Sequence, residues 1–498
     1  MEYISTRGYK NHITASHAIV SGIAPDGGLF VPESIPELSQ DELIGLYKKS
    51  FQDIALFIMK KFLTDFAAED LINCISGAYN SKHFDNPMIC PLRPLADSTV
   101  MLELWHGPTC AFKDIALQLL PKLLTVSANN IGEKNTFIIL TATSGDTGKA
   151  ALEGFKDVPA TKVVVFFPQD GVSEIQKSQM VTQEGNNVHV IGVRGNFDHT
   201  QSGVKELFGD TELASRLAKS GYKLTSANSI NWGRLLPQIV YYFSSYMSLL
   251  KSSHIKFGDK INVCVPTGNF GNIMAGFYAK RMGLPINKLI IATNENNVLA
   301  KFLRAGKYNA DLELKTTISP SMDILVSSNL ERLLFEVAEH NSEKIYNLMN
   351  CLKENQTYKV DKKMLSQIKE DFYANYASEK STIRTIRSIF RKYKYTIDPH
   401  TAVGLHVYQK YVKKTGDPTV TVIASTASPY KFNRSVMQAI SRKRGSESKN
   451  EFELLNLLSV TTHTLIPKQL KNLNTKPILH KTVCEKDKMK LILERIFE

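Results

Sequence analysis

Residues 261–276 read INVCVPTGNFGNIMAG, and this stretch joins a short apolar run to a glycine-rich turn and an apolar helix. An apolar run of this length, rich in valine, predicts a buried strand. Further runs of the same kind are each followed by a longer segment with helical spacing, at 137–140, 163–167, 188–193, 288–292 and 420–424. Strands that alternate with helices indicate βαβ units and mostly parallel sheet. We therefore predict an α/β fold.

The chain divides by pattern into two regions. Residues 1–95 hold a turn and a short strand at 24–32, then helical spacing over 41–79, and they form a predicted N-terminal domain. Residues 96–498 hold the alternating runs and are predicted to form two α/β subdomains, the smaller at about 135–225. Residues 341–395 show helical spacing and predict a helical insertion.

Composition excludes several classes of protein. Hydrophobic residues make up 43% and charged residues 22% of the 498, as in folded globular chains. The sequence lacks an apolar run near the ~18 residues of a membrane span, and the first ten residues are too polar for a signal peptide. The six cysteines are scattered without a C-x-x-C pair, so we expect neither disulfides nor a metal site. We expect a cytoplasmic protein.

The net charge of +13 raises the possibility of nucleic-acid binding. The excess lies in residues 341–498, which hold 29 Lys+Arg against 15 Asp+Glu, while the rest of the chain is nearly neutral. These basic residues are interleaved with apolar ones at helical spacing, which favours solvated helix faces. We therefore expect no nucleic-acid partner and no membrane partner.

The turn at Gly268, Asn269, Phe270, Gly271 and Asn272 follows a strand and opens a helix. Such a turn presents unpaired backbone N–H groups and the positive end of the helix dipole, which together suit a phosphate. The glycine spacing differs from the G-x-G-x-x-G of dinucleotide sites. A simple β-to-α turn without a ligand is the alternative interpretation.

A second loop, TATSGDTGKAA at 141–151, resembles a nucleoside-triphosphate loop because glycine and lysine are adjacent. The glycine five places earlier and the hydroxyl residue after the lysine are both missing, which argues against that function. The remaining hydroxyl and amide groups at a helix start suit a carboxylate or a phosphate. Ordinary helix capping by Ser144 or Asp146 is the alternative.

A third stretch, HGPTCAFKDIALQLL at 106–120, embeds Lys113 among apolar neighbours. Burial disfavours the charged amine and lowers its pKa, as a Schiff-base lysine requires. A surface lysine with a partly buried stem is the alternative. An amine together with anion-binding loops points to pyridoxal 5′-phosphate, which has an aldehyde and a phosphate.

Several motifs together resemble the threonine synthase family in its longer form, with an added N-terminal domain. They match in the family's order over about residues 5–440, and they are APDGGLFVP (24–32), HGPTCAFKDIALQ (106–118), TSGDTG (143–148), NSINWGRLLPQ (228–238), PTGNFGN (266–272), SPSMDILVSSNLER (319–332), DPHTAVG (398–404) and STASPYKF (425–432). The resemblance implies a fold-type-II pyridoxal-phosphate enzyme, similar to the tryptophan synthase β subunit. It also implies conversion of O-phospho-L-homoserine and water to L-threonine and phosphate, the last step of threonine biosynthesis.

The resemblance implies a role for each matching position. Lys113 would hold the cofactor aldehyde, the turn from Gly268 to Asn272 its phosphate, and Thr426 would hydrogen-bond its ring nitrogen. The substrate carboxylate would face Ser144, Gly145, Asp146 and Thr147. Analogy with related enzymes puts the substrate phosphate near Asn228, Ser229 and Arg234, although Arg234 could equally pair with a structural carboxylate.

Two functions remain open at this point. A phospholyase with the same cofactor and phosphate contacts would release an α-keto acid and ammonia instead of threonine, and it would share most of these motifs. His106 could contact the cofactor or serve a structural hydrogen bond, and the purpose of His400 in DPHTAVG is open. We expect a monomer or a homodimer.

Overall fold

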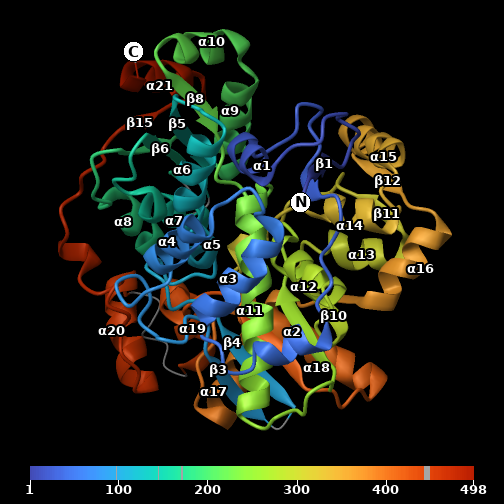
Figure 1. The fold of residues 1–498 in the computed structure, drawn as a ribbon. Helices are drawn as coiled ribbons and strands as arrows, with labels where there is room; N and C mark the ends of the chain where they lie inside the picture. The colour runs from blue at the N-terminus through green and yellow to red at the C-terminus, as the bar shows by residue number, and fades with distance from the viewer. Residues whose placement is uncertain (97, 144, 170–171, 442–448, 498) are drawn as a thin grey trace.

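The computed structural model describes residues 1–96, 98–143, 145–169, 172–441 and 449–497. Two sheets organise most of this chain, and the long helix α11 (Trp232–Lys251) runs lengthwise through the middle of the molecule (Figure 1). All but three of the residues of α11 are buried. A helix that is apolar on every side is stable only when it is surrounded by protein, so α11 forms the shared core of the domains.

The larger sheet has the strand order β13-β10-β9-β14-β4-β3, and all its neighbours are parallel except the antiparallel pair β3 and β4. Its strands are β3 (Leu92–Ala96), β4 (Thr99–Glu103), β9 (Ile261–Pro266), β10 (Ile286–Thr293), β13 (Phe372–Tyr376) and β14 (Thr421–Ser425). The central strands β9 and β14 are buried along their whole length. Burial on both faces explains why their sequences read as continuous apolar runs.

The smaller sheet is wholly parallel, with the order β15-β7-β6-β5-β8. Its strands are β5 (Thr136–Ala142), β6 (Thr161–Pro168), β7 (Val188–Val193), β8 (Tyr222–Thr225) and β15 (Val483–Cys484). Helices α7 (Asp146–Phe155), α8 (Glu174–Val181), α9 (Phe197–Gly209) and α10 (Thr211–Lys219) connect these strands. All six predicted apolar runs lie in strands, so the predicted α/β organisation is confirmed.

The first 79 residues pair β1 (Tyr3–Ser5) with β2 (Phe30–Pro32) in an antiparallel ribbon. The helices of this segment are α1 (Ala15–Ser21), α2 (Gln40–Gly45), α3 (Phe51–Phe62) and α4 (Ala68–Ala78). Ser50 and Asp53 form a capping box at the start of α3, whose apolar face packs against α11. The helical spacing predicted over 41–79 is therefore divided among three helices.

The remaining helices pack around the two sheets and α11. They are α5 (Lys113–Leu117), α6 (Leu120–Asn130), α12 (Gly271–Arg281), α13 (Val298–Ala305), α14 (Leu330–Val337), α15 (Ser342–Asn355), α16 (Lys362–Asp371), α17 (Glu379–Tyr393), α18 (Pro399–Thr415), α19 (Asn433–Ile440), α20 (Glu451–Thr462) and α21 (Met489–Phe497), with short 3₁₀ turns at η1 (Pro320–Met322), η2 (Pro429–Phe432), η4 (Leu473–Thr475) and η5 (Lys486–Lys488). A third small ribbon pairs β11 (Lys307–Asn309) with β12 (Thr357–Lys359).

The prediction of a helical insertion at 341–395 is wrong in part, because the strands β12 and β13 both lie within it. Helices α15, α16 and α17 do lie there, but β13 pairs in parallel with β10 and forms an edge of the larger sheet. The β13 sequence FYANY is fully buried only at Phe372, as is typical of an edge strand. Helical spacing in its neighbours masked this short strand.

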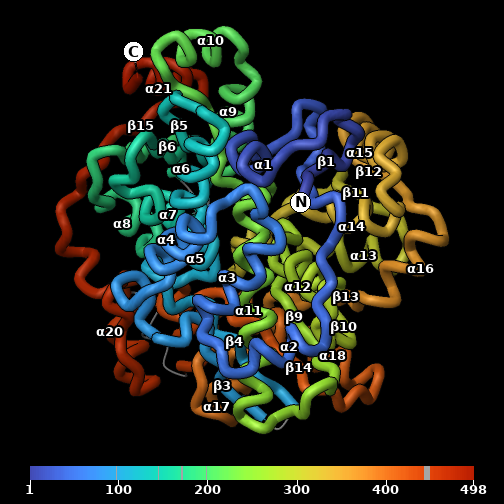
Figure 2. The backbone as a smooth tube through the Cα atoms, in the orientation of Figure 1, coloured from blue at the N-terminus to red at the C-terminus, as the bar shows by residue number. Residues whose placement is uncertain are grey.

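The C-terminal segment returns to the smaller sheet. After α20 the chain runs along the outside of the molecule and ends beside α9 and α10 (Figure 2). There β15 pairs with β7, and Leu493 and Phe497 of α21 join the apolar cluster on one face of the sheet. The smaller sheet therefore extends beyond the predicted residues 135–225 and includes a strand from the far end of the chain.

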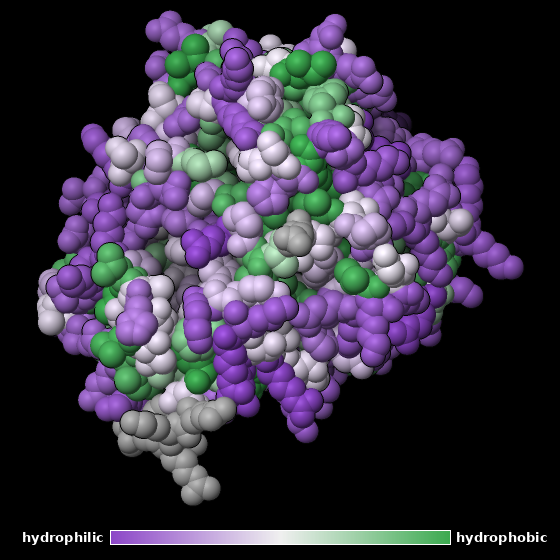
Figure 3. Space-filling model, turned by 90° about the horizontal axis from the view of Figure 1, so that it is seen from below, coloured by the Kyte–Doolittle hydropathy of each residue, from purple (hydrophilic) through white to green (hydrophobic). Residues whose placement is uncertain are grey.

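The outer surface is largely polar. Seen from the side of α17, hydrophilic side chains cover most of the surface and apolar groups are gathered nearer its middle (Figure 3). In the part of the chain that the structure describes, no helix combines the length and apolar character needed to cross a bilayer.

Candidate active site

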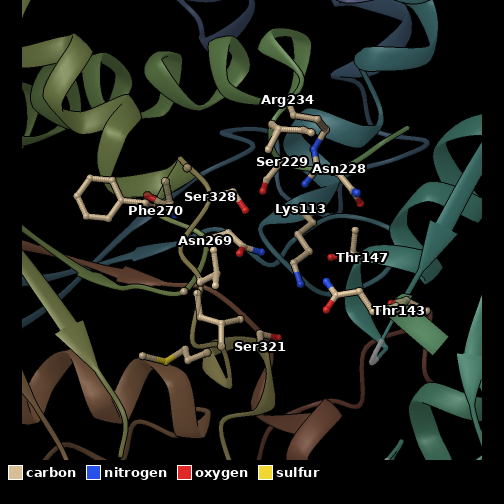
Figure 4. Close-up of a pocket in the computed structure, with 18 of the residues that line it drawn as sticks. Lys113, Thr143, Thr147, Asn228, Ser229, Arg234, Asn269, Phe270, Ser321 and Ser328 are labelled. Carbon is tan, nitrogen blue, oxygen red and sulfur yellow. The ribbon is translucent and has the colours of Figure 1, made fainter. Parts of the chain in front are cut away.

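A cavity of about 870 Å³ opens where β5, β9 and β14 end, and Lys113 lies in its wall. The carboxyl ends of parallel strands are the usual place for a ligand in such sheets. Figure 4 shows the Lys113 amine in the middle of this space, between Thr147 on one side and Asn269 on the other.

Lys113 is the first residue of α5 and its side chain is half-buried. Within the described residues, no carboxylate lies at ion-pairing distance from its amine, unlike the amines of the buried Lys149 and Lys431. Burial, opposed by Asp146, lowers the pKa of Lys113 to about 8 from its ordinary 10.5. A neutral amine is therefore accessible near neutral pH, as nucleophilic chemistry requires.

The glycine-rich turn follows β9 and lines the cavity as predicted. Phe270 adopts a left-handed conformation with φ of 67°, and its ring packs against Phe372 and points away from the amine (Figure 4). A Cβ atom on Gly268 would lie only 2.8 Å from the carbonyl oxygen of Ser321. Glycine is required there because the two backbones approach closely.

The start of α12 fits an anion. No side chain caps this helix among the described residues, so its first N–H groups are available to a ligand. The Asn272 side-chain amide nitrogen is also buried without a hydrogen-bond partner, while its oxygen accepts from the Tyr242 hydroxyl. A phosphate at this point would satisfy these donors.

A neighbouring segment that sequence reasoning left without a role holds the turn in place. The Asn329 side-chain amide donates to the carbonyl oxygen of Asn269 at 3.0 Å, and the Ser327 hydroxyl donates to that of Gly268 at 2.7 Å. Both belong to the motif SPSMDILVSSNLER. Its run of hydroxyl and amide residues was the signal for a loop-holding function.

Thr426 lies directly after β14, is nearly buried and lines the cavity. His400, whose purpose the sequence left open, lines the same cavity. Its Nδ1 lies 2.6 Å from Asp398, and its Nε2 accepts from the backbone N–H of Ser321 at 3.2 Å. His400 therefore helps to hold the Ser321 segment beside the glycine turn.

The loop between β5 and α7 behaves differently from the prediction. Thr143 and Thr147 line the cavity, but Thr143 Oγ1 already accepts from the N–H groups of Gly145 and Gly148 at 3.0 and 2.9 Å. Gly145 and Asp146 do not line the cavity, and Ser144 lies outside the described residues. Thr147 is the loop residue with a free cavity-facing side chain.

The Asp146 carboxylate is committed to an ion pair. Its Oδ1 lies 2.6 Å from Lys431 Nζ and accepts from Gln176 Nε2 at 2.9 Å. Burial alone would raise the pKa of Asp146, but the cations of Lys431 and Lys113 outweigh it and hold the pKa below its usual value. That Asp146 faces the substrate carboxylate stays a prediction, and its side chain does not support it, because like charges repel and the carboxylate already has Lys431 as its partner.

Asn228, Ser229 and Arg234 lie together at the end of the cavity above Lys113 (Figure 4). Arg234 is only 3% exposed, and it has no carboxylate partner among the described residues. One nitrogen donates to the Ala227 carbonyl oxygen, and its Nε has no partner. Desolvation lowers the pKa of Arg234 to about 10, and the guanidinium remains charged at neutral pH. A buried cation of this kind is suited to an anionic ligand.

His106 serves a structural purpose. Its two ring nitrogens lie 2.6 Å from Asp85 and 2.9 Å from Glu103, and it stacks on Trp105. His106 is not among the residues that line the cavity. Of the two histidines that the sequence singled out, His400 is the one that lines the site.

The charged and polar groups divide the cavity into two anion-binding ends with one amine between them. The α12 start lies at one end and Arg234 at the other, and the volume is ample for a cofactor together with a small substrate. An aldehyde that also bears a phosphate matches the amine and the α12 end. A second, phosphorylated molecule matches the Arg234 end.

Comparison with known families and structures agrees with this chemistry. Three family models match the chain: "Threonine synthase N terminus" at residues 2–79, "Pyridoxal-phosphate dependent enzyme" at 77–350 and "Threonine synthase, C-terminal" at 401–492. A crystal structure of PLP-bound threonine synthase from Brucella melitensis superimposes with a TM-score of 0.88 at 36% identity, covering 100% of this chain and 98% of that one.

Two curated relatives illustrate the range of similarity. Threonine synthase from Schizosaccharomyces pombe is 40% identical over 470 residues, which are 89% of this chain and 90% of that protein. Threonine synthase-like 1 from Homo sapiens is 38% identical over 490 residues. That match covers 96% of this chain, and this chain spans only 63% of the length of that relative.

Proposed function

Because the chain belongs to the threonine synthase family, we propose that it converts O-phospho-L-homoserine and water to L-threonine and inorganic phosphate. The reaction exchanges the phosphate ester at the γ carbon for a C–H bond and places the water oxygen on the β carbon. Cleavage of a carbon–oxygen bond makes the enzyme a lyase. The fold is that of type II pyridoxal-phosphate enzymes with an added N-terminal domain.

Pyridoxal 5′-phosphate is the cofactor of this fold, and when bound it supplies an aldehyde and an electron-withdrawing ring. The Lys113 amine would hold the aldehyde, and the backbone from Gly268 to Asn272 would hold the phosphate. The unpaired donors at the start of α12 support this orientation. The Thr426 hydroxyl would hydrogen-bond the ring nitrogen.

Lys113 also moves protons in the proposed mechanism. The reaction removes a proton from the α carbon and one from the β carbon, delivers one to the γ carbon and returns one to the α carbon, while one proton of the added water leaves with the phosphate. A single amine with a pKa of about 8 can accept and donate protons near neutral pH. Its central position between the two anion-binding ends supports this function.

The substrate would lie with its phosphate at the Arg234 end. The guanidinium with Asn228 and Ser229 would bind the phosphate and hold the leaving group as its bond to the γ carbon breaks. The Thr147 hydroxyl and the N–H groups at the start of α7 would bind the carboxylate. The single observation that carries the proposal is the position of the Lys113 amine between the uncapped start of α12 and the buried Arg234, neither amine nor guanidinium having a carboxylate partner among the described residues.

The test is an assay of products. We expect purified holoenzyme to convert O-phospho-L-homoserine to threonine and phosphate in equal amounts, with little 2-oxobutyrate. Release of 2-oxobutyrate and ammonia without threonine would instead identify the phospholyase. Lys113→Ala should abolish threonine formation and the absorbance of the lysine-bound cofactor, and normal turnover by this variant would overturn the assignment of Lys113.

A second measurement identifies the lysine directly. Borohydride reduction of the holoenzyme followed by peptide mapping should find the cofactor on Lys113. The buried Lys149 and Lys431 serve as internal controls, because both amines are ion-paired. Cofactor on either of them would contradict the proposal.

We also propose two catalytic subdomains within residues 96–498 after an N-terminal domain at 1–95, supported by the family-model boundary at 77–79. We propose a cytoplasmic location as well, which the free thiols favour. We also propose that the enzyme is a monomer or a homodimer. Sedimentation of the purified enzyme and imaging of a tagged chain in cells test these two points.

A further inference from the structure

Lys431 lies in η2 with its side chain fully excluded from solvent. Its Nζ is 2.6 Å from Asp146 Oδ1 and donates to the carbonyl oxygen of Thr109 at 2.9 Å. A buried ammonium is costly unless it is paired and hydrogen-bonded. Both requirements are met here by residues far away in the chain.

The three residues belong to three different segments around the cavity. Asp146 begins α7 of the smaller sheet, Thr109 precedes Lys113 in its loop, and Lys431 follows the end of β14, where Thr426 lies. One ammonium therefore joins the proposed carboxylate loop, the Lys113 loop and the Thr426 loop. The smaller sheet is tied to the larger one at the edge of the active site.

The Asp146 carboxylate accepts two further hydrogen bonds. Its Oδ1 accepts from Gln176 Nε2 at 2.9 Å, and its Oδ2 accepts from the Ser321 hydroxyl at 3.3 Å. Ser321 lines the cavity, and a Cβ on Gly145 would collide with the Gln176 side chain at 2.4 Å. The orientation of the α7 start is thus set by the network around the Asp146 carboxylate.

We propose that Lys431 is a positioning residue that neutralises Asp146 and thereby aims the start of α7 at the carboxylate of the substrate. The proposal rests on the function proposed above, because it concerns how that substrate is bound. Without Lys431, an unpaired carboxylate would remain beside the place where the substrate carboxylate binds, and the loop would lose its anchor to Thr109. Binding of the anionic substrate would weaken, while the cofactor phosphate site at α12 would remain intact.

The charge of the pair also acts on Lys113. The Asp146 carboxylate raises and the Lys431 ammonium lowers the pKa of the Lys113 amine. Removing the Lys431 charge therefore moves the rise of kcat with pH toward higher pH, because the Lys113 amine is free only in the substrate complex. A residue that merely supports the fold would not move this profile.

The experiment uses holoenzyme variants Lys431→Met, Asp146→Asn and the double variant. Rapid-mixing titration of the cofactor absorbance with O-phospho-L-homoserine, read before turnover, measures Kd. Absorbance without substrate measures cofactor content, and thermal melting measures stability. We expect Lys431→Met to raise Kd by about 10–100-fold, the effect of losing a charged hydrogen bond. Cofactor content should stay near that of wild type. The double variant should regain about tenfold in affinity over Lys431→Met, because the unpaired carboxylate is gone.

Lys149→Met is the matched control. Lys149 lies on α7, the helix that Asp146 begins, is largely buried and pairs with Glu153 of the same helix at 3.0 Å, so this ion pair does not join the loops around the cavity. Its loss should lower the melting temperature without changing Kd. If Lys431→Met does not fold, two other variants test the proposal. Lys431→Arg keeps the charge and should bind substrate within a few-fold of wild type. Asp146→Asn removes a carboxylate that raises the pKa of Lys113 and should shift the pH profile toward lower pH.

Two outcomes would overturn the proposal. One is an unchanged Kd and pH profile in Lys431→Met, and the other is a double variant no better than Lys431→Met. Either would leave the proposed function standing, provided that wild type makes threonine. Wild type that binds the substrate but makes no threonine would overturn the function and leave the Kd test of Lys431 valid.

Discussion

The backbone N–H of Phe112 donates a hydrogen bond to the carbonyl oxygen of Thr426 over 2.9 Å. The adjacent residues Ala111 and Ala427 form an antiparallel bridge. These backbone contacts fix the start of α5 beside the end of β14, so Lys113 and Thr426 face one cavity. Side-chain substitutions at Lys113 or Thr426 should therefore change chemistry without displacing this frame.

The first prediction concerns the pH dependence of cofactor capture. Burial lowers the pKa of Lys113 to about 8, so the amine is mainly protonated below that pH and neutral above it. The rate at which cofactor-free protein captures pyridoxal phosphate should rise roughly tenfold per pH unit below about pH 8 and then level off. Absorbance followed after rapid mixing measures this rate. A rise that continues to about pH 10 would indicate an ordinary exposed lysine.

Arg234→Met should separate substrate binding from stability. Loss of a charged donor to the substrate phosphate should raise Kd for O-phospho-L-homoserine by about 10–100-fold. The melting temperature should hold or rise, because a buried guanidinium without a carboxylate partner is removed. Arg93→Met, at an exposed arginine away from the cavity, is the control and should leave Kd unchanged. Weaker stability with unchanged Kd would show that Arg234 serves the fold alone.

Asn272→Asp should weaken cofactor binding without lowering the melting temperature of the cofactor-free protein. A carboxylate at the start of α12 would repel the cofactor phosphate, and we expect at least about a tenfold loss of cofactor affinity. An acidic residue at a helix start favours the helix by about 0.3–1 kcal/mol, so the cofactor-free protein should melt no earlier than wild type. Asn272→Ala, which lacks the charge, should lose less affinity. Equal losses in the two variants would contradict the repulsion argument.

His106 should stabilise the fold in a pH-dependent way. Burial alone would lower its pKa, but Asp85 and Glu103 raise the pKa of His106 to about 9 from its ordinary 6.5. A raised pKa means that the stabilisation is complete below about pH 6.5 and disappears as pH rises through about 9. The difference in melting temperature between wild type and His106→Gln should therefore shrink between about pH 6 and 9.5. A constant difference would mean that the charged form contributes nothing.

The sequence was informative wherever a local pattern carries the physics. Residues 188–193 were predicted as a strand and form β7 with the same bounds. The glycine turn and Lys113 were recognised because close backbone approach and a lysine among apolar neighbours are local signals. Strand β15 was missed because it has only two residues, which lie between polar neighbours in the sequence. It is a strand only through its pairing with β7.

In the active site, too, local motifs were recognised from the sequence, and contacts between residues far apart in the chain were not. The sequence placed Asp146 toward the substrate, but the structure pairs it with Lys431. The motif STASPYKF was recognised, but Lys431 within it was given no role, although it too is a lysine beside apolar residues. The loop-holding contacts of Asn329 were also unpredictable from spacing.

By itself the sequence determined which segments become strands and helices, where glycine must allow close approach, and which amine is embedded in apolar surroundings. These properties depend on neighbours along the chain. The tertiary structure alone decided which charges neutralise each other: Lys431 was paired with Asp146, whereas Arg234 and Lys113 were left unpaired. Ion pairing depends on distance in space and on exclusion of water, and neither can be read from the order of residues.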